Sequence, residues 1–257
     1  MPEEREIKIP VGMDFVLPDL GGVVEGIRAV DRGRVELSAT YWDTDELTLL
    51  HAKLGLRHRS APGEQGKWTL KAGDRMVGDA VSREETDFPG SPDQPPEAAV
   101  EVIRKAVGDV ALHPVAQLVT DRHSVDLIAG DTRWAEVADD RVSVRSGDAT
   151  VESFGEVEVE LFEADEALID AVMARLRAAG IGEPDSTPKY VRALRALGHQ
   201  IPNGQLSERV SQPAHWSEER AAARLTRAAL PSVGTPPPRP HPPGWQPPSD
   251  VAPGRAS

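Results

Sequence analysis

The sequence has no cysteine, and this absence excludes a whole set of chemistries. Without a thiol, the 257-residue chain cannot form disulfides, bind zinc through thiolates or use a cysteine nucleophile. No apolar run approaches the length of a transmembrane helix, and the first residues are charged, unlike those of a signal peptide. We therefore expect a soluble, cytoplasmic protein with no membrane partner.

The sequence also lacks the positive charge that is typical of nucleic-acid-binding proteins. It has 42 acidic and 29 basic residues, for a formal net charge of −13. Because nucleic-acid-binding proteins usually carry a basic surface, we expect no nucleic-acid partner. A small anionic ligand is compatible with this balance, since Arg and Lys can line an interior within an acidic shell.

Three widespread catalytic motifs are missing as well. The phosphate-binding pattern G-x-x-x-x-G-K-[ST] does not occur, because Gly66-Lys67 is followed by Trp68. Neither H-E-x-x-H nor G-x-S-x-G is present. Any catalysis must therefore come from residues outside these motifs.

Proline marks a boundary near the end of the chain. Ten of the 23 prolines lie between Pro231 and Pro253, and a segment of this composition cannot build a packed core. We expect two parts, a folded domain over 1–202 and a largely disordered, Pro-rich tail over 203–257. Within the tail, Ser217–Leu230 is compatible with a short helix that has Ser217 as its N-cap.

Residues 1–202 are predicted to form mostly strands, because polar and apolar residues alternate along many segments. Eight strands with few helices predict an α+β fold, in which an antiparallel β-barrel or strongly curved sheet has flanking helices. Asp43 and Glu46, three residues apart, resemble a capping box. The expected helices cover Glu46–Lys53, Pro96–Val107, Glu166–Ala179 and Tyr190–Leu197. After a strand at the N-terminus, the expected strands cover Val35–Trp42, Leu56–Arg59, Lys67–Lys71, Val81–Phe88, Val115–Leu127, Trp134–Arg145 and Val151–Phe162.

The first strand shows a pattern that returns in later strands. Glu4, Glu6 and Lys8 alternate with Ile7 and Ile9, so the charged side chains share one face. Apolar residues on the opposite face must pack, normally against helices, which leaves solvent or an interior for the charged face. For a single strand of this kind, a charged face exposed to solvent is favoured. Six strands with the same alternation favour charged faces that line an interior. A one-residue slip of the strand register would turn these faces outward. The later rows are Arg57 with Arg59, Lys67 with Lys71, Arg83 with Glu85, Arg122, Glu136 with Asp140, and Glu156, Glu158 and Glu160.

Such a lining suits metal-assisted phosphoryl transfer. Carboxylates crowded in an interior need cations, and Mg²⁺ or Mn²⁺ prefers oxygen ligands. Guanidinium and ammonium groups bind phosphate oxygens, and a metal ion can activate a water for the attack, so no protein nucleophile is required. A binding module that holds polyphosphate without turnover would need the same basic residues. The carboxylates favour catalysis, because a receptor for polyanions gains little from acidic groups beside its ligand.

The charged motifs, taken in order, resemble those of CYTH domains, the triphosphate tunnel metalloenzymes. The similarity covers roughly residues 1–200. It rests on E-x-E-x-K at Glu4–Lys8, Y-W-D-T at Tyr41–Thr44, L-R-H-R at Leu56–Arg59, K-W-T-L-K at Lys67–Lys71, R-E-E at Arg83–Glu85, Arg122, Asp140, E-V-E-V-E at Glu156–Glu160 and S-T-P-K-Y at Ser186–Tyr190.

The resemblance implies an eight-stranded antiparallel tunnel that binds triphosphate compounds together with Mg²⁺ or Mn²⁺. It assigns catalysis to Glu4, Glu6, Lys8 and Glu158, with Arg83 and Glu85 in support. It implies metal ligands at Glu4, Glu6, Asp140, Glu156, Glu158 and Glu160. It implies phosphate contacts at Lys8, Arg57, Arg59, Lys67, Lys71, Arg122 and Lys189.

Membership of this family would not fix the substrate. Its members include inorganic triphosphatases, thiamine triphosphatases, adenylyl cyclases of one class and RNA triphosphatases. The sequence does not indicate an aromatic-rich pocket for a base or a thiamine ring. We therefore expect hydrolysis of inorganic triphosphate to pyrophosphate and phosphate. Thiamine triphosphatase, adenylyl cyclase and non-catalytic polyphosphate binding are the alternatives.

Overall fold

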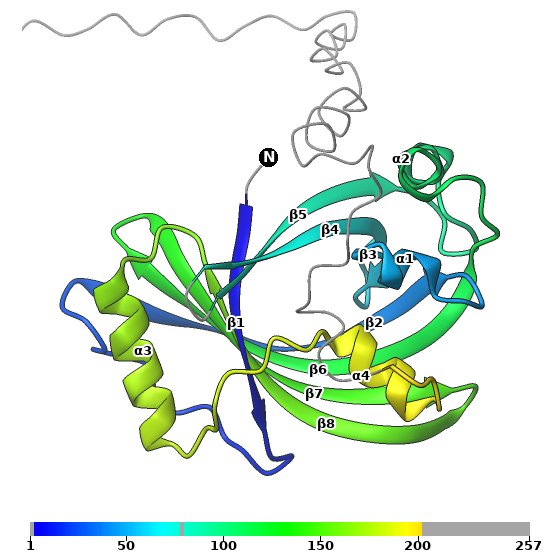
Figure 1. Ribbon diagram of the computed structural model, residues 1–257. Coiled ribbons are helices and arrows are strands. Elements are labelled where there is room, and N and C mark those ends of the chain that lie inside the picture. Colours follow the sequence, from blue (N-terminus) through cyan, green and yellow to red (C-terminus); the bar gives the residue numbers. More distant parts are fainter. Residues whose placement is uncertain (1–2, 78–79, 202–257) are drawn as a thin grey trace, which may run out of the picture. The chain divides into compact units, whose positions relative to one another are not determined.

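Strands dominate the computed structural model, which describes residues 3–77 and 80–201 (Figure 1). The strands are β1 (Glu3–Val11), β2 (Ile27–Asp43), β3 (Leu54–Ser60), β4 (Lys67–Val77), β5 (Ala80–Pro89), β6 (His113–Ala129), β7 (Thr132–Ser146) and β8 (Ala149–Leu161). The helices are α1 (Thr48–His51), α2 (Glu97–Val107), α3 (Glu166–Ala178) and α4 (Lys189–Ala196).

The strands form one antiparallel sheet that closes on itself. Their order is β1-β5-β4-β3-β2-β6-β7-β8, and β1 pairs with both β5 and β8. The β6–β7 and β7–β8 connections are two-residue turns that begin with Gly130 and Gly147, both at positive φ. A type II′ hairpin turn requires this conformation at its first central residue, and glycine adopts it without strain. The expected eight-stranded antiparallel barrel is therefore present.

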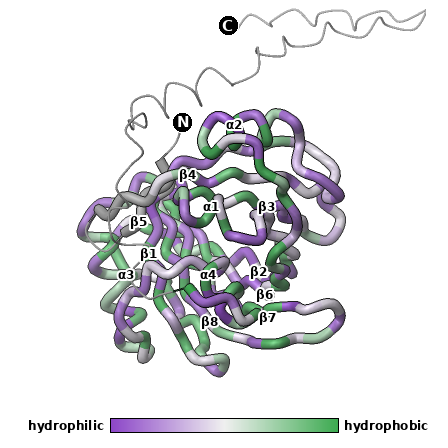
Figure 2. Tube along the Cα trace, turned by 45° about the vertical axis from the view of Figure 1, so that its right-hand side comes forward, coloured by the Kyte–Doolittle hydropathy of each residue, from purple (hydrophilic) through white to green (hydrophobic). Residues whose placement is uncertain are grey.

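The outer face of one half of the barrel is apolar and is covered by α3. Val137 and Val157 are fully buried on this face and belong to the same core as Leu168 and Val172 of α3. Figure 2 shows hydrophilic and hydrophobic segments alternating along these strands. The alternation therefore places apolar side chains on the outer face of the barrel, under a helix, and charged side chains on its inner face.

The other half of the barrel repeats this arrangement with α2. Trp68 and Leu70 of β4 are buried with Trp42 of β2, and Ala99 and Ile103 of α2 pack against them. The indole Nε1 of Trp68 donates a hydrogen bond of 2.8 Å to the Ser91 carbonyl. The two helices thus bury the faces that would otherwise be exposed apolar surface.

The helix α4 lies on the inner side of the sheet instead. Its Val191 and Leu194 are completely buried in a third apolar core with Leu118 of β6 and Val142 and Val144 of β7. These strand residues share the face that carries the charged side chains farther along the barrel. In Figure 1, α4 lies within the curve formed by β6, β7 and β8. The polar interior is therefore bounded at one end by an apolar plug.

The prediction for the first helix was wrong in its bounds and in its cap. The helix α1 begins at Thr48 rather than Glu46, because Leu47 has a left-handed backbone with φ of 56°. The Asp43 carboxylate accepts hydrogen bonds from the backbone N–H groups of Leu49 and Leu50, at 2.8 and 3.0 Å. Asp43 therefore caps the helix directly, without a capping box.

Several other bounds differ from the expectation, and strand β4, for example, continues to Val77 rather than ending at Lys71. Strand β2 begins at Ile27, eight residues before the predicted start, because a register irregularity between Asp31 and Gly33 breaks the alternation there. Helix α4 includes Lys189 as its first residue. The predicted tail over 203–257, with its helix, lies outside the described residues. Within the described part of the chain, no helix has the length and apolar character needed to cross a membrane.

Candidate active site

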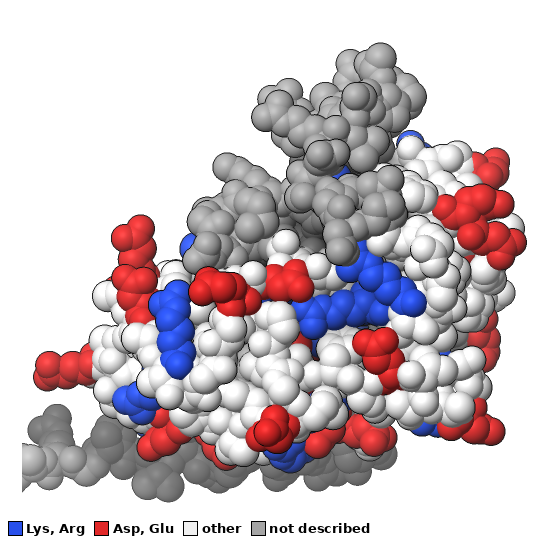
Figure 3. Space-filling model, turned by 60° about the horizontal axis from the view of Figure 1, so that its bottom comes forward, with Lys and Arg blue, Asp and Glu red and all other residues white. Residues whose placement is uncertain are grey.

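A cavity of about 440 Å³ lies inside the barrel, and every strand contributes to its wall. All the residues that were predicted to contact phosphate line it, and six come from four strands while Lys189 comes from α4. Figure 3 shows a continuous patch of lysine and arginine side chains flanked by acidic ones on the face it views. The basic residues of the cavity wall that were predicted are Lys8, Arg57, Arg59, Lys67, Lys71, Arg122 and Lys189.

Arg57 and Arg59 of β3 form the centre of the basic side. The positive charge of Arg57, together with burial and the charge of Arg122, lowers the pKa of Arg59. Among the described residues, Arg59 has no hydrogen bond or ion pair that would balance its charge. An anion in the cavity would relieve the repulsion between these guanidinium groups.

On β4 and β5, each lysine of the basic side has its own carboxylate. The Lys67 ammonium lies 2.5 Å from Asp87, and Lys71 is ion-paired with Glu85. Burial would raise the pKa of Asp87, but hydrogen bonds from Lys67 and Thr69 outweigh burial and lower it. Asp87 was not among the predicted site residues, although it shares a face with Glu85.

The acidic side begins at Arg122, which is surrounded by carboxylates. Its Nε and Nη2 donate to the two oxygens of Asp140, at 2.8 and 2.7 Å, and Nη2 also lies 2.5 Å from Glu158. Glu136 is farther away, at 3.8 Å. Burial disfavours the charged guanidinium, but Glu158 and Asp140 outweigh burial and raise its pKa well above the ordinary value.

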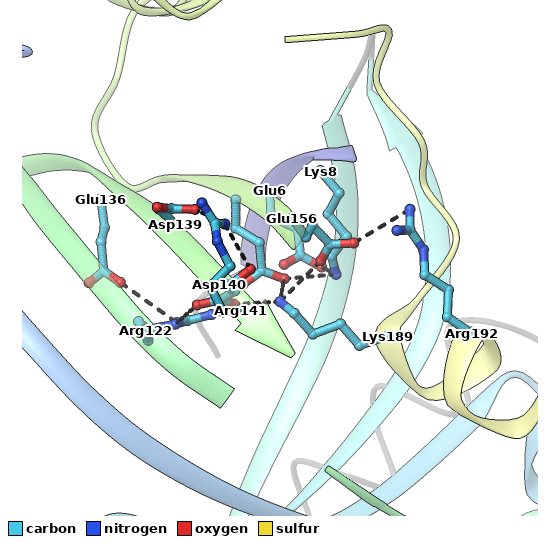
Figure 4. A network of polar contacts seen from close by, with 11 residues as sticks. Glu6, Lys8, Arg122, Glu136, Asp139, Asp140, Arg141, Glu156, Lys189 and Arg192 are labelled. Carbon is cyan, nitrogen blue, oxygen red and sulfur yellow. Dashed lines mark hydrogen bonds and ion pairs between the residues drawn. The ribbon is translucent and has the colours of Figure 1, made fainter. Parts of the chain in front are cut away.

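Lys189 enters this cluster from α4 (Figure 4). Its Nζ lies 2.7 Å from Asp140, 2.7 Å from Glu158 and 3.0 Å from Glu156. Burial opposes the charge of the lysine, but these carboxylates outweigh burial and raise its pKa. In return Lys189 and Lys8, against the effect of burial, hold the pKa of Glu158 well below its ordinary range.

Glu156 has a different environment from Glu158. It is completely buried and does not line the cavity, and neither of its oxygens accepts a hydrogen bond among the described residues. Besides Lys189, its cationic neighbour is Arg192, at 3.6 Å. Burial raises the pKa of Glu156. The structure thus places this predicted ligand behind the cavity wall, under α4.

A row of three carboxylates crosses β1, β8 and β7. Glu6, Glu160 and Glu136 are directly opposite one another in the strand register, and all three line the cavity. Burial raises the pKa of Glu160, and the negative charges of Glu136 and Glu6 raise it further. Glu6 also accepts a hydrogen bond of 2.5 Å from Lys8.

Residues 3–191 match the family model of the CYTH domain. The chain belongs to the CYTH domain family. Two uncharacterized proteins of Mycobacterium tuberculosis, Rv2226 and MT2285, are each 28% identical over 242 residues, which cover 83% of this chain and 46% of the relative. The chain therefore spans about half the length of the curated relatives it matches.

Solved structures with a similar fold share little sequence with this CYTH protein. The Hippeastrum protein HpAC1, described as a candidate adenylyl cyclase with a dominant triphosphatase activity, is 14% identical, with a TM-score of 0.48 over 79% of this chain and 98% of that one. A protein of Bacillus halodurans described as a candidate adenylate cyclase is 16% identical, with a TM-score of 0.45 over 75% of this chain and 98% of that one.

The carboxylates of this CYTH domain have the donor chemistry of a magnesium or manganese site. Their oxygens are the ligands that hard divalent cations prefer, and Glu6, Asp140, Glu158 and Glu160 share the cavity wall. However, no group of three or more acidic or histidine side chains among the described residues is arranged to hold an ion. Lys189 and Arg122 lie between these carboxylates instead.

Two residues of the predicted set fall on side chains that are not described. Of Glu4 and Arg83 only the backbone is described, and it places them directly opposite each other in the β1–β5 pair. Their predicted roles in metal binding and in support of the basic cluster stay predictions.

The sequence prediction also missed an aromatic contact at the cavity wall. Tyr41 and Tyr190 both line the cavity and stack on each other, with ring centroids 4.8 Å apart. The Tyr190 hydroxyl donates a hydrogen bond of 2.9 Å to the buried carboxylate of Asp43. Tyr41 opposes Arg57 in the register, and against the effect of burial Arg57 lowers the pKa of its hydroxyl. Both tyrosines lay within motifs of the resemblance, but neither was assigned a role.

Proposed function

We propose that this protein is a metal-dependent triphosphatase and that it hydrolyses inorganic triphosphate to pyrophosphate and phosphate. The observation that carries the proposal is the division of one interior cavity into a basic side and an acidic side. The interiors of most proteins are apolar, because burying unbalanced charge is costly. Here the basic side contains the half-buried guanidinium groups of Arg57 and Arg59, which are suited to a compact polyanion.

On the basic side, Arg57 and Arg59 would bind the phosphate chain. A guanidinium fork matches two phosphate oxygens at once, and such charge-assisted hydrogen bonds are stronger than neutral ones. Arg59 is the most suitable anchor, because it makes no hydrogen bond or ion pair among the described residues and is repelled by Arg57 and Arg122. Lys67 and Lys71 would bind oxygens at the edge of the same wall, each held in place by its carboxylate partner.

On the acidic side, Glu6, Asp140, Glu158 and Glu160 would hold Mg²⁺ or Mn²⁺, together with Glu4 of the same strand as Glu6. A divalent ion bound there would supply charge neutralisation for the phosphates and a water of lowered pKa for attack. Glu156 is a weaker candidate than the sequence implied, because it lies behind the wall of the cavity.

Between the two sides, Lys8 and Arg122 would stabilise the charge that develops during the reaction. Both line the cavity, and both are held by carboxylates, Lys8 by Glu6 and Arg122 by Asp140. Charge in phosphoryl transfer spreads over the equatorial oxygens and the leaving group, where a fixed cation is most effective. These two residues therefore have positions from which they can contact the transferred phosphoryl group.

The cavity wall favours an inorganic substrate over a nucleotide or thiamine ester. Tyr41 and Tyr190 are the aromatic residues of its described wall, and they already stack on each other. One face of each ring is therefore occupied within the protein. The rest of the wall is dominated by charged groups, which match phosphates rather than an organic ring.

The proposal can be tested with a panel of substrates. Phosphate release would be measured from tripolyphosphate, ATP and thiamine triphosphate, each with Mg²⁺, with Mn²⁺ and with EDTA. We expect release from tripolyphosphate to be the fastest and to require the metal. Cyclic AMP and pyrophosphate from ATP would instead indicate a cyclase. Inactivity towards all three substrates in the presence of metal would contradict an enzymatic function, and tight polyphosphate binding without turnover would indicate a binding module.

A further inference from the structure

The ammonium group of Lys189 occupies the point where three carboxylates converge. It is within 3.0 Å of Asp140, Glu156 and Glu158, which come from two neighbouring strands. In Figure 4 the lysine extends from the first turn of α4 towards these carboxylates. Both residues 140 and 156 are completely buried. Lys189 thus supplies the positive charge that this part of the interior needs.

A divalent ion and this ammonium group cannot share the same carboxylates. Mg²⁺ binds oxygen at about 2.1 Å with near-octahedral geometry, so it requires the space that Nζ fills. Their charges also repel each other strongly at such short distances. In the described part of the chain, with Lys189 in this position, no group of three or more acidic or histidine side chains is arranged to hold an ion.

Lys189 is held by contacts of a different kind from those of Arg122, the other cation of the cluster. Arg122 binds Asp140 through two parallel hydrogen bonds of a rigid fork. Lys189 makes single-point contacts through a flexible stem and is the first residue of α4, where the helix dipole disfavours a positive charge. The carboxylates therefore keep Lys189 in place, and it can turn away when they gain another counter-ion.

A phosphate chain bound in the same cavity would give the Lys189 ammonium group a second set of anionic partners. Lys189 lines the cavity, and the next residue, Tyr190, stacks on Tyr41. Tyr41 lies opposite Arg57 of the basic side in the strand register. The lysine is therefore located between the acidic side and the basic side.

We propose that Lys189 is an internal counter-ion that competes with the divalent metal for Asp140 and Glu158 and moves to the phosphates when they bind. Metal and phosphate then bind with positive coupling, since each ligand favours the arrangement that the other needs. This inference rests on the metal site of the proposed function. It assigns Lys189 to both sides of the cavity, rather than to phosphate binding alone.

The first test is binding of Mn²⁺ alone, measured from the electron paramagnetic resonance signal of free Mn²⁺. The wild-type 257-residue chain would be compared with Lys189→Met and with Lys53→Met. Lys53 lines the same cavity but has no ion pair with these carboxylates, so it controls for the loss of one positive charge. We expect Lys189→Met to bind Mn²⁺ about tenfold tighter or more. Binding no tighter than that of Lys53→Met would overturn the proposal.

The second test adds inorganic phosphate, which chelates Mn²⁺ only weakly. In the wild-type protein phosphate is expected to tighten Mn²⁺ binding severalfold, and in Lys189→Met this effect is expected to shrink. An equal effect in both proteins would contradict the coupling. If Lys189→Met is unfolded without metal, Mn²⁺ should restore its fold, and a variant that stays unfolded would count against the proposal.

The two proposals fail in distinguishable ways. A wild-type protein that binds no Mn²⁺ and hydrolyses no triphosphate would contradict the proposed function itself. A wild-type protein that hydrolyses tripolyphosphate with Mn²⁺, but whose Lys189→Met variant binds Mn²⁺ no more tightly, would contradict the role of Lys189 alone.

Discussion

Arg122 of β6 and Asp140 of β7 lie directly opposite each other and are joined by two hydrogen bonds, from Nε to Oδ1 and from Nη2 to Oδ2. Asp140 has no exposed surface and the Arg122 side chain is 17% exposed. The pair thus connects two adjacent, hydrogen-bonded strands on the inner face of the barrel. Its energetic weight depends on this burial, because exposed ion pairs contribute little.

Replacement of Arg122 by Ala is expected to lower the free energy of unfolding by about 3 to 5 kcal/mol, because the buried Asp140 carboxylate loses two hydrogen bonds and one of its two ion pairs. Arg34→Ala is the matched control. Arg34 pairs with Asp121 on neighbouring strands at 3.0 Å, but both side chains are 53% exposed. Its loss is expected to cost less than about 1 kcal/mol. Urea denaturation of both variants measures the difference, and equal effects would contradict the importance of the buried pair.

Replacement of Arg59 by Gln is expected to weaken binding without weakening the fold. Arg57 and Arg122 repel Arg59 and lower its pKa. Removing the charge of Arg59 therefore removes an unfavourable electrostatic interaction from the folded state. A charge-assisted hydrogen bond is worth about 1.5 to 3 kcal/mol, which predicts tripolyphosphate binding about 10- to 100-fold weaker. Calorimetric titration in EDTA measures binding, and thermal unfolding measures stability.

The control for Arg59 is Arg28→Gln, which removes an exposed guanidinium that is not part of the cavity wall. We expect this change to leave tripolyphosphate binding within about twofold of wild type, because exposed charges are largely screened. If Arg59→Gln bound tripolyphosphate as tightly as Arg28→Gln does, the basic side would not be the phosphate site.

Alternation along the strands predicted most of the charged residues that line the interior, but not the position of Glu156 behind the cavity wall. In β8, Glu158 and Glu160 face the cavity while Val157 and Val159 are buried in the core under α3. The period of two in a strand fixes this division once helices cover the apolar face. The number of such strands left a barrel and a strongly curved sheet open. The resemblance to CYTH domains implied a closed tunnel, and the pairing of β1 with both neighbours confirms the closure.

The position of α4 could not be predicted from the sequence. The apolar residues Val191 and Leu194 predict a buried helix face, but not which side of the sheet buries it. In the structure α4 packs against the inner side, and it therefore covers Glu156 and brings Lys189 to the carboxylates. Glu136 was passed over for another reason: it shares a face with Asp140, but the family resemblance pointed to Asp140 alone.

Replacement of Tyr190 by Phe tests how α4 is attached to the barrel. The Tyr190 hydroxyl donates to Asp43, which is completely buried and also caps α1. Loss of this donor is expected to cost about 1 to 3 kcal/mol of stability, because one oxygen of a buried carboxylate loses a partner. Tyr41→Phe, which keeps the stacked rings, is the control. Chemical denaturation measures both variants, and a loss of stability in Tyr190→Phe no larger than that in Tyr41→Phe would contradict the importance of the Asp43 contact.

The two neighbouring glutamates of β8 are expected to respond to neutralisation in opposite directions. Glu158 lies among Lys189, Lys8 and Arg122, which outweigh burial and hold its pKa well below the ordinary value of 4.5. Burial and the carboxylates of Glu136 and Glu6 raise the pKa of Glu160 above 4.5. The ionised form of Glu158 therefore stabilises the fold, whereas the ionised form of Glu160 destabilises it.

The pH dependence follows from these signs. The contribution of Glu158 is complete above pH 4.5 and is lost as the pH falls through its lowered pKa. The penalty from Glu160 is complete above its raised pKa and disappears as the pH falls below 4.5. At pH 7 in EDTA, Glu158→Gln is expected to lower the free energy of unfolding by about 3 kcal/mol, and Glu160→Gln to raise it by about 1 kcal/mol. Urea denaturation at pH 7 and at pH 4 measures both effects, and the gain from Glu160→Gln should vanish at the lower pH. A loss of stability in Glu160→Gln at pH 7 would show that cations, rather than carboxylates, dominate its surroundings.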